Sequence, residues 1–352
     1  MVAPILIDAI TYSCLYILLS LGLTLTYMTT RVPNFAHASF AIIGSYITWT
    51  WVTSRIVSSI ENAIEQGLDP REINVLIREF TLQPADYIAV LVLSFVVVGL
   101  VGLAQYLLVL KPLSNRGSTL IGLMIATIAV DMLIFSFINI YADYAQAYYN
   151  GVLKELSEKA GYKIPLLVKT RDFTLYAYDR LKGLNVQGSL VLLPSLVLGL
   201  LAVLQVLLTK TKIGIALRAS VENPMLAEVA GVNVNRVYAL AWFVSAGLAG
   251  CAGALVPLRL FTNPALGHTL IVSIFAASIV GGLNVIYGAF LGGLLVGMSE
   301  TLIMNFLTLH LGLNAGYRPM IPLLIMAVML LLLPEGIGGY EWSKFKKRVK
   351  AS

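Results

Sequence analysis

Charge is scarce in this sequence of 352 residues, and the scarcity excludes most kinds of soluble protein. Asp, Glu, Lys and Arg make up 12% of the chain, about half the share of roughly 25% in soluble domains. Hydrophobic residues make up 58%, and the mean hydropathy is +0.85. So much apolar surface has to be covered by lipid, which excludes a soluble enzyme, a disordered tail and a nucleic-acid-binding module. The net charge of +6 therefore bears on membrane orientation rather than on a polyanionic ligand.

Cysteine and histidine are also scarce, and a phosphate-binding loop is missing. The two cysteines, Cys14 and Cys251, lie in apolar runs, and the three histidines show no ligand spacing. The sequence therefore supports neither a disulfide framework nor a metal site. No Gly-Lys dipeptide occurs, which excludes the Gly-x-x-x-x-Gly-Lys-Ser/Thr loop of many ATPases. No nucleophile–base pair is visible, so we expect that the chain is not an enzyme and binds no cofactor itself.

Long apolar runs dominate instead, and they predict an all-α polytopic membrane protein with a single transmembrane domain over 1–352. A bilayer core needs about 20 apolar residues per helix. The stretch 269–309 is long enough for two helices around the turn signal at 281–284, although a re-entrant segment would suit it as well. We expect about eight spans, and the other apolar runs are 5–28, 35–53, 87–110, 119–141, 189–209, 237–257 and 319–334. Four glycines in this region are spaced for close helix packing: Gly288, Gly292, Gly293 and Gly297.

Two polar stretches, 54–86 and 142–188, interrupt the apolar pattern, and we expect them to form small helical or irregular caps on the external face. Loops of the opposite face are about twice as dense in basic residues, with 12 of the 24 Lys and Arg in roughly 55 positions. Because positive loops face the cytoplasm, the predicted protein of the cell membrane has an external N-terminus and a cytoplasmic C-terminus. The basic residues of the cytoplasmic loops are Arg31, Lys111, Arg116, Lys210, Lys212, Arg218, Arg236, Lys344, Lys346, Lys347, Arg348 and Lys350.

The cytoplasmic loop 210–236 is longer than a simple connection between two helices. Such connections take roughly 2–8 residues, so the additional length of this loop needs a reason. Asn223 is a helix cap, Pro224 suits the first helical position, and Gly231 suits the end, so we expect an isolated helix of about two turns. A helix this short is unstable alone. It either covers span ends at the membrane interface or fits a groove on a cytoplasmic partner. Its apolar face consists of Met225, Leu226, Val229 and Ala230.

Four polar residues inside or beside the spans are candidates for a substrate pathway, because ionisable groups in the membrane are costly. Asp131 lies mid-span and Glu300 follows a glycine-rich segment. For each of them, the alternatives are contact with substrate and a structural hydrogen bond to a neighbouring helix. Asn34 and His37 share one helical face after Pro33. They either surround a helix start that attracts a carboxylate or merely anchor the helix entry.

Several short segments occur in a fixed order along the chain. They are Thr24 to Tyr27, Val32 to His37, Lys111 to Leu113, Arg218 to Ser220 followed by Ala227, Glu228, Ala230 and Gly231, the pair Gly281-Gly282, Gly297 to Glu300, and Leu333 to Ile337. In combination they resemble the permease subunits of ABC importers, in particular the branched-chain amino acid permeases of the LivH type. In that family the loop matching 210–236 is a coupling loop in a cleft of the ATPase subunit. The resemblance therefore implies that the ATPase-coupling residues are Arg218, Glu222, Asn223, Pro224, Met225, Ala227, Glu228 and Gly231.

The resemblance also implies a substrate and a set of partners. The substrates would be branched-chain or other small apolar amino acids. The partners would be two cytoplasmic ATP-binding subunits, which hold ATP and Mg²⁺, a second related permease and an extracytoplasmic substrate-binding protein. Permeases for urea and short amides are similar, so these substrates are an alternative. An ion-coupled secondary transporter using Asp131 or Glu300, or a passive channel, is an alternative of another class. The long, capped cytoplasmic loop favours the ABC importer, because the other two classes need no docking element.

Overall fold

The computed structural model describes residues 2–180 and 187–339, and it confirms the predicted all-α membrane fold. In the described residues, the only β-type pairing is one antiparallel bridge between Phe173 and Thr262. The segment η1 is π-helical, and η2 to η4 are short 3₁₀ turns. The helices are α1 (Val2–Thr30), α2 (His37–Glu65), α3 (Pro70–Glu79), α4 (Pro84–Ala104), η1 (Gln105–Leu110), α5 (Lys111–Asn115), α6 (Leu120–Ala160), η2 (Tyr176–Tyr178), α7 (Gly188–Lys210), α8 (Lys212–Glu222), α9 (Pro224–Val229), α10 (Val234–Leu255), η3 (Val256–Leu258), α11 (Leu266–Gly281), α12 (Ile286–Leu311), η4 (Ala315–Tyr317), α13 (Met320–Leu332) and α14 (Gly336–Gly339).

Seven helical stretches of the described chain are long and apolar enough to cross a membrane. Two further helices, α2 and α11, match the expected run at 35–53 and the first part of 269–309, but they are not among the seven. α2 is long enough but carries many Ser, Thr and Trp residues, whereas α11 is apolar but has only 16 residues. The predicted turn at 281–284 is confirmed, because it separates α11 from α12. The seven stretches are Ile5–Thr30, Pro84–Asn115, Leu120–Ala160, Gly188–Lys210, Val234–Leu258, Ile286–Leu311 and Ala315–Gly339.

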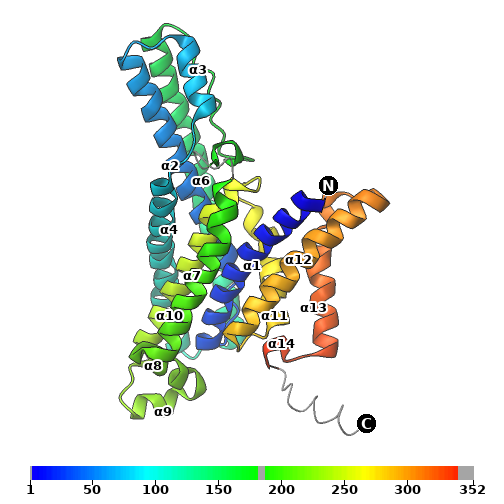
Figure 1. Ribbon diagram of the computed structural model, residues 1–352. Helices are drawn as coiled ribbons and strands as arrows, with labels where there is room; N and C mark the ends of the chain where they lie inside the picture. The colour runs from blue at the N-terminus through cyan, green and yellow to red at the C-terminus, as the bar shows by residue number, and fades with distance from the viewer. Residues whose placement is uncertain (1, 181–186, 340–352) are drawn as a thin grey trace.

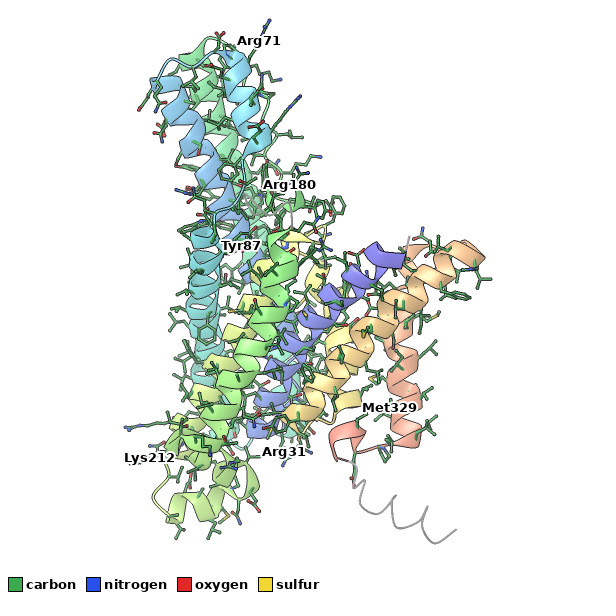
Figure 2. All side chains as sticks on the ribbon, in the orientation of Figure 1. Arg31, Arg71, Tyr87, Arg180, Lys212 and Met329 are labelled. Carbon is green, nitrogen blue, oxygen red and sulfur yellow. The ribbon has the colours of Figure 1, made fainter. Side chains whose placement is uncertain are left out.

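The two polar stretches lie together at one end of the molecule, and the loop 210–236 lies at the opposite end (Figure 1). We call these the α3 end and the α9 end, after the helices that they contain. Figure 2 shows Arg71 and Arg180 at the α3 end, and Arg31 and Lys212 at the α9 end. α1 begins on the α3 side of the membrane-spanning helices, and α14 lies toward the α9 end.

The α3 end is a helical projection beyond the membrane. At about 1.5 Å per residue, the 41 residues of α6 extend for about 60 Å, twice the roughly 30 Å of a bilayer core. α3 packs against the extension of α2, and Ile60, Ile73 and Ile77 are buried there. Leu153 and Leu156 of α6 belong to the same buried cluster. The projection therefore has an apolar core that residues from both polar stretches share.

The glycines of α12 let two neighbouring helices approach closely, as their spacing predicts. A Cβ atom added to Gly288 or Gly292 would lie 2.0 Å from a backbone oxygen of α11. A Cβ added to Gly293 or Gly297 would lie 2.7 or 2.4 Å from a Cα atom of α1. Because only glycine leaves room for these approaches, α12 is held between α1 and α11 by close backbone packing.

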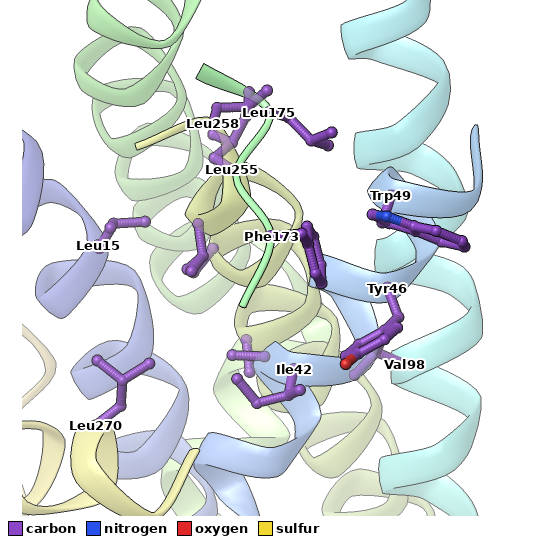
Figure 3. Close-up of a cluster of buried hydrophobic side chains, with 14 of the residues drawn as sticks. Leu15, Ile42, Tyr46, Trp49, Val98, Phe173, Leu175, Leu255, Leu258 and Leu270 are labelled. Carbon is purple, nitrogen blue, oxygen red and sulfur yellow. The ribbon is translucent and has the colours of Figure 1, made fainter. Parts of the chain in front are cut away.

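The segment between α6 and α7 is fixed against α2 at the α3 side of the membrane-spanning helices (Figure 3). The hydroxyl of Tyr46 donates to the carbonyl oxygen of Thr170 at 2.7 Å, and Trp49 Nε1 donates to the carbonyl oxygen of Lys169 at 2.9 Å. The ring of Phe173 packs edge-on against the ring of Tyr46, with 5.4 Å between the centroids. These contacts anchor the base of the projection to the buried cluster.

Candidate functional site

The loop between α7 and α10 forms two helices, and its residues cap the second of them. Asn223 follows α8 and caps α9, because its Oδ1 accepts a hydrogen bond from the N–H of Leu226 at 3.0 Å. Pro224 occupies the first position of α9, where its missing N–H costs nothing. Gly231 follows the helix with a φ of +86°, in the left-handed region that favours glycine. α9 thus has defined ends although it contains only six residues.

Most apolar side chains of α9 face outward. Met225 is 79% exposed and Val229 is 85% exposed, whereas Ala227 is 4% exposed and packs inward. Apolar side chains in water at the end of a membrane protein cost free energy unless a partner covers them. We call the exposed side of α9 the docking face, after the docking role that the sequence predicts, and it consists of Met225, Leu226, Glu228 and Val229. The other exposed residues of the predicted coupling set are Arg218, Glu222, Asn223, Pro224 and Gly231.

α8 attaches the docking face to two membrane-spanning helices. Leu217 of α8 is buried in a small cluster with Leu25 of α1 and Ala241 of α10. The hydroxyl of Tyr238 in α10 donates to the carbonyl oxygen of Ser220 at 3.0 Å. A displacement of α8 therefore acts directly on α1 and α10.

A cavity of about 540 Å³ lies beside this attachment at the α9 end. It is bounded by the last turn of α1, by η1 and α5, and by the starts of α9 and α10. The cavity therefore lies between the start of α9 and the membrane-spanning helices. The polar residues that line it include Arg31, Tyr106, Lys111, Glu222, Asn235 and Tyr238.

The chain between α1 and α2 turns back into the helical bundle. Arg31 has a φ of +56°, and His37 at the start of α2 lies beside the middle of α1, with Nε2 3.0 Å from the carbonyl oxygen of Leu19. Irregular backbone at this depth is tolerated where protein shelters it, and both Asn34 and His37 are fully buried. Asn34 Oδ1 accepts a hydrogen bond from Gln105 Nε2 at 3.0 Å. α2 therefore begins inside the bundle.

Several polar atoms at the start of α2 lack partners. Asn34 Nδ2, His37 Nδ1 and Gln105 Oε1 are buried and form no hydrogen bond with the described part of the chain. Gln105 begins the π-helical η1, and the wider turn precedes Pro112, whose ring cannot fit a regular helix interior. An unpaired buried polar atom costs about 1–3 kcal/mol, so this position is a candidate for a bound water or for a polar part of a substrate.

Asp131 of α6 connects the first turns of α2 and α11. One of its oxygens accepts a hydrogen bond from Ser39, and Oδ2 lies 3.4 Å from His268 Nδ1. Gly267 packs on the same turn of α2, because a Cβ added to it would lie 3.3 Å from Ser39 Oγ. Three of the four predicted pathway residues, Asn34, His37 and Asp131, therefore surround one helix start. Within residues 2–180 and 187–339, no group of three His, Cys, Asp or Glu side chains is placed to hold a metal ion.

Glu300 lies apart from this group, in a network that joins α1, α11 and α12. Its Oε1 accepts hydrogen bonds from the hydroxyl of Tyr16 at 2.9 Å and from Arg318 Nε at 2.5 Å. Its Oε2 accepts from Ser273 Oγ at 2.9 Å. Arg318 Cζ also lies 3.6 Å from the ring centroid of Tyr12. Both carboxylates thus form structural hydrogen bonds to neighbouring helices, and their contact with substrate stays a prediction.

The partners of these polar residues are not evident from the sequence. Gln105 is uncharged, so a search for charge inside spans passes over it. His268 and Arg318 stand immediately before the apolar runs that begin at 269 and 319, so the same search assigns them to loops. The one available signal is that an intramembrane carboxylate requires a donor or cation. The sequence does not specify which residue supplies it, because the partners are distant along the chain.

Comparisons with known proteins cover nearly the whole chain. The family model described as "Branched-chain amino acid transport system / permease component" matches residues 5–333. The protein named "Probable branched-chain amino acid transport permease protein LivH" from Methanocaldococcus jannaschii is 40% identical over 349 residues, which are 99% of this chain and 96% of that protein. No solved structure matches the chain.

More distant bacterial relatives carry related names. The high-affinity branched-chain amino acid transport system permease protein BraD of Pseudomonas aeruginosa is 24% identical over 95% of this chain and 94% of its own length. The permease protein LivH of Escherichia coli K12 is 23% identical over 94% of both chains. Together with a family model that matches most of its length, these similarities show that the chain belongs to the permease component family of branched-chain amino acid transport systems.

Proposed function

We propose that this chain is the membrane-spanning permease subunit of an ABC importer for branched-chain or other small apolar amino acids. The family match over 5–333 supports the transport role. The observation that carries the mechanism is the docking face, which is apolar, capped and exposed at the α9 end. A partner that buries this face would bring its own movements to bear on the membrane-spanning helices.

In the proposed mechanism, a cytoplasmic ATPase subunit holds α9 in a cleft. When ATP binding changes the shape of that subunit, α9 and α8 move together, because only Asn223 lies between them. Leu217 transmits the movement to Leu25 and Ala241, and so to α1 and α10. Since α1 packs on α12 and α10 packs on α2, the displacement opens the pathway alternately to the two sides of the membrane.

The proposed complex contains two ATP-binding subunits, a second related permease and an extracytoplasmic substrate-binding protein. ATP and Mg²⁺ belong to the ATPase subunits, and this chain acts without a cofactor and without catalysing a reaction itself. The α9 end faces the cytoplasm, and the α3 end faces outward. This orientation follows from the basic residues in the loops of the α9 end, which include Arg31, Lys111, Arg116 and the four of the loop 210–236.

The test is co-purification of the tagged chain in mild detergent from membranes in which its natural partners are expressed, followed by uptake assays in liposomes. We expect an ATPase, a second permease and ATP-dependent uptake of leucine, isoleucine or valine. Uptake of urea or short amides in place of amino acids would change the substrate. A chain that takes up substrate alone, driven by an ion gradient, would contradict the importer mechanism and place Asp131 and Glu300 at its centre.

A further inference from the structure

A second cavity, of about 360 Å³, lies on the α3 side of the membrane-spanning helices. α1, α11 and α12 surround it, together with the residues that follow η3 and those that precede α13. Its size falls within the roughly 300–1,000 Å³ of small-molecule sites. It is separate from the docking face and from the residues around the start of α2. Its lining contains the whole hydrogen-bond network of Glu300 described above.

One wall of the cavity is charged. Arg259 and Arg318 line it together with Glu300, and the charges balance because Glu300 pairs with Arg318 and Asp8 pairs with Arg259. Arg259 has a side-chain exposure of only 6% and pairs at 2.9 Å with Asp8, which is not part of the lining. The hydrogen bonds of Arg318 to Glu300 and Thr301 use two of the five N–H groups of its guanidinium. This wall is therefore suited to a carboxylate, which guanidinium groups bind with two parallel hydrogen bonds.

The remaining walls are apolar or aromatic. Leu260, Leu266 and Leu270 contribute to the lining, together with the rings of Tyr12 and Tyr16. Aromatic faces attract cations, and the Tyr12 ring already carries the guanidinium of Arg318. An ammonium group would therefore be attracted by the Tyr16 ring and by the negative charge of Glu300. An amino acid with a branched apolar side chain presents a carboxylate, an ammonium group and an aliphatic group, and the cavity offers a complement to each of the three.

We propose that this cavity binds the transported amino acid on its way from the external face. Arg318, with Arg259, holds the carboxylate, Glu300 and the ring of Tyr16 face the ammonium group, and the three leucines contact the side chain. The proposal rests on the proposed function and makes it more specific by assigning a substrate site within this chain. Buried charged side chains are costly in a membrane protein, and a charged substrate is a reason to keep them there.

The proposal is tested by equilibrium binding of radiolabelled leucine to the purified complex, without nucleotide and without the external binding protein. Two competitors separate the contributions of the ammonium group and of the carboxylate to binding. 4-Methylpentanoate keeps the carboxylate and the side chain, and leucinol lacks the carboxylate. We expect 4-methylpentanoate to compete, and leucinol to compete at least about tenfold more weakly than leucine, as the loss of a charged hydrogen bond predicts. Competition by leucinol equal to that of leucine would overturn the carboxylate assignment.

The double substitution Glu300→Gln and Arg318→Gln tests the charged wall. It removes both charges of this ion pair, so neither residue is left as an unpaired charge. We expect leucine binding to weaken at least about tenfold, while the complex still assembles with its ATPase. The control is Arg171→Gln, which breaks the exposed ion pair with Asp143 on the projection and should leave leucine binding unchanged. Unchanged leucine binding by the double variant would overturn the proposal.

A second variant tests the apolar wall. It also keeps the site testable if the double variant does not assemble. Leu266→Ala should weaken leucine binding and improve competition by phenylalanine, because it enlarges the cavity where the side chain lies. An unaltered ratio of the two affinities would contradict the assigned orientation. If the wild-type complex assembles with its ATPase and transports leucine, but these variants bind leucine as the wild type does, only the proposed site is refuted. If no ATPase associates with the wild-type chain, the proposed function itself fails.

Discussion

α3 and α9 are short helices at opposite ends of the molecule, and they place their apolar side chains in opposite ways. α3 has ten residues and buries Ile73 and Ile77 against the rest of the projection. α9 has six residues and exposes Met225 and Val229. A short helix can therefore bury its apolar side within this chain, and the exposure of α9 is not a necessary result of its length. The α3 end thus buries these apolar residues within one chain, whereas α9 leaves its own exposed, as we expect of a helix that docks on a second protein.

The two helices begin in nearly the same way, so the difference does not come from local sequence signals. Asp69 precedes Pro70 at the start of α3, and Asn223 precedes Pro224 at the start of α9. Each start supplies a capping side chain and a proline at the first position. The tertiary structure then gives α3 a partner in α2, and leaves α9 beside a cavity. Four substitutions test this contrast, in order of decreasing expected effect.

The largest effect is expected for Ile73→Ala in the core of the projection. Loss of a buried Ile side chain typically costs about 2–5 kcal/mol, so the projection should become much more sensitive to limited proteolysis. ATPase association should not change, because the site lies at the other end. The control is Val75→Ala on the same helix, where the side chain is 51% exposed and the expected change is within about 0.5 kcal/mol. Equal protease sensitivity of both variants would mean that the projection has no core of its own.

A smaller effect is expected for Gly231→Val, which changes the end of α9. A β-branched residue in the left-handed region is strained by about 1–3 kcal/mol, so the chain should rearrange and displace the docking face. We expect ATPase affinity, measured by titration in detergent, to fall about tenfold. Gly231→Asn is the control, because Asn tolerates this region. Wild-type affinity in the valine variant would show that the conformation at Gly231 has no part in docking.

Asn223→Ala removes the cap of α9, and we expect the stability of this helix to fall by about 1 kcal/mol. The helix should fray in the free chain, and ATPase binding should weaken about fivefold because the helix must then be ordered on binding. Asn223→Asp keeps a capping oxygen and should retain wild-type affinity. The same titration measures both variants. Equal affinities would mean that α9 is held in shape by its partner and not by its cap.

The smallest effect is expected for Glu228→Lys, which reverses an exposed charge on the docking face. Charges at the edge of an interface act mainly on the association rate, and they act less at high salt. We expect a loss of a few-fold in the rate of ATPase association at low salt and little difference at high salt. Stopped-flow or surface-binding kinetics at two salt concentrations measure this. An effect that does not depend on salt would place Glu228 in the buried centre of the interface instead.

Much of the fold follows from hydrophobic runs and local signals. The runs predict the all-α membrane fold, the turn at 281–284 separates two helices, and the glycines of α12 mark close packing. Asn223, Pro224 and Gly231 define a helix that the structure contains. Each of these features is encoded within a few residues of the place where it acts, so the sequence predicts it directly.

The features that the sequence does not predict depend on contacts between distant segments. The described parts of 54–86 and 142–188 contain the small helix α3 and an irregular segment after α6, but also continuous extensions of α2 and α6, which the sequence does not predict. Glu300 pairs with Arg318, and Asp131 lies beside His268. Neither hydrophobic periodicity nor residue spacing in the sequence predicts these pairs. The return of the chain before α2 is also a tertiary effect, because it is stabilised by burial of Asn34 and His37 among other helices.

The most direct test of α9 as the docking element compares thiol labelling at the two ends of the molecule. Cys14 and Cys251 are buried, so Val229→Cys adds an accessible thiol on α9, and Val75→Cys adds one on α3. Both variants should react readily with a polar maleimide in the free chain. After addition of the ATPase subunit, we expect the thiol of Val229→Cys to become protected, while that of Val75→Cys reacts at an unchanged rate. If the ATPase binds and labelling at 229 continues at the free rate, α9 is not the docking element.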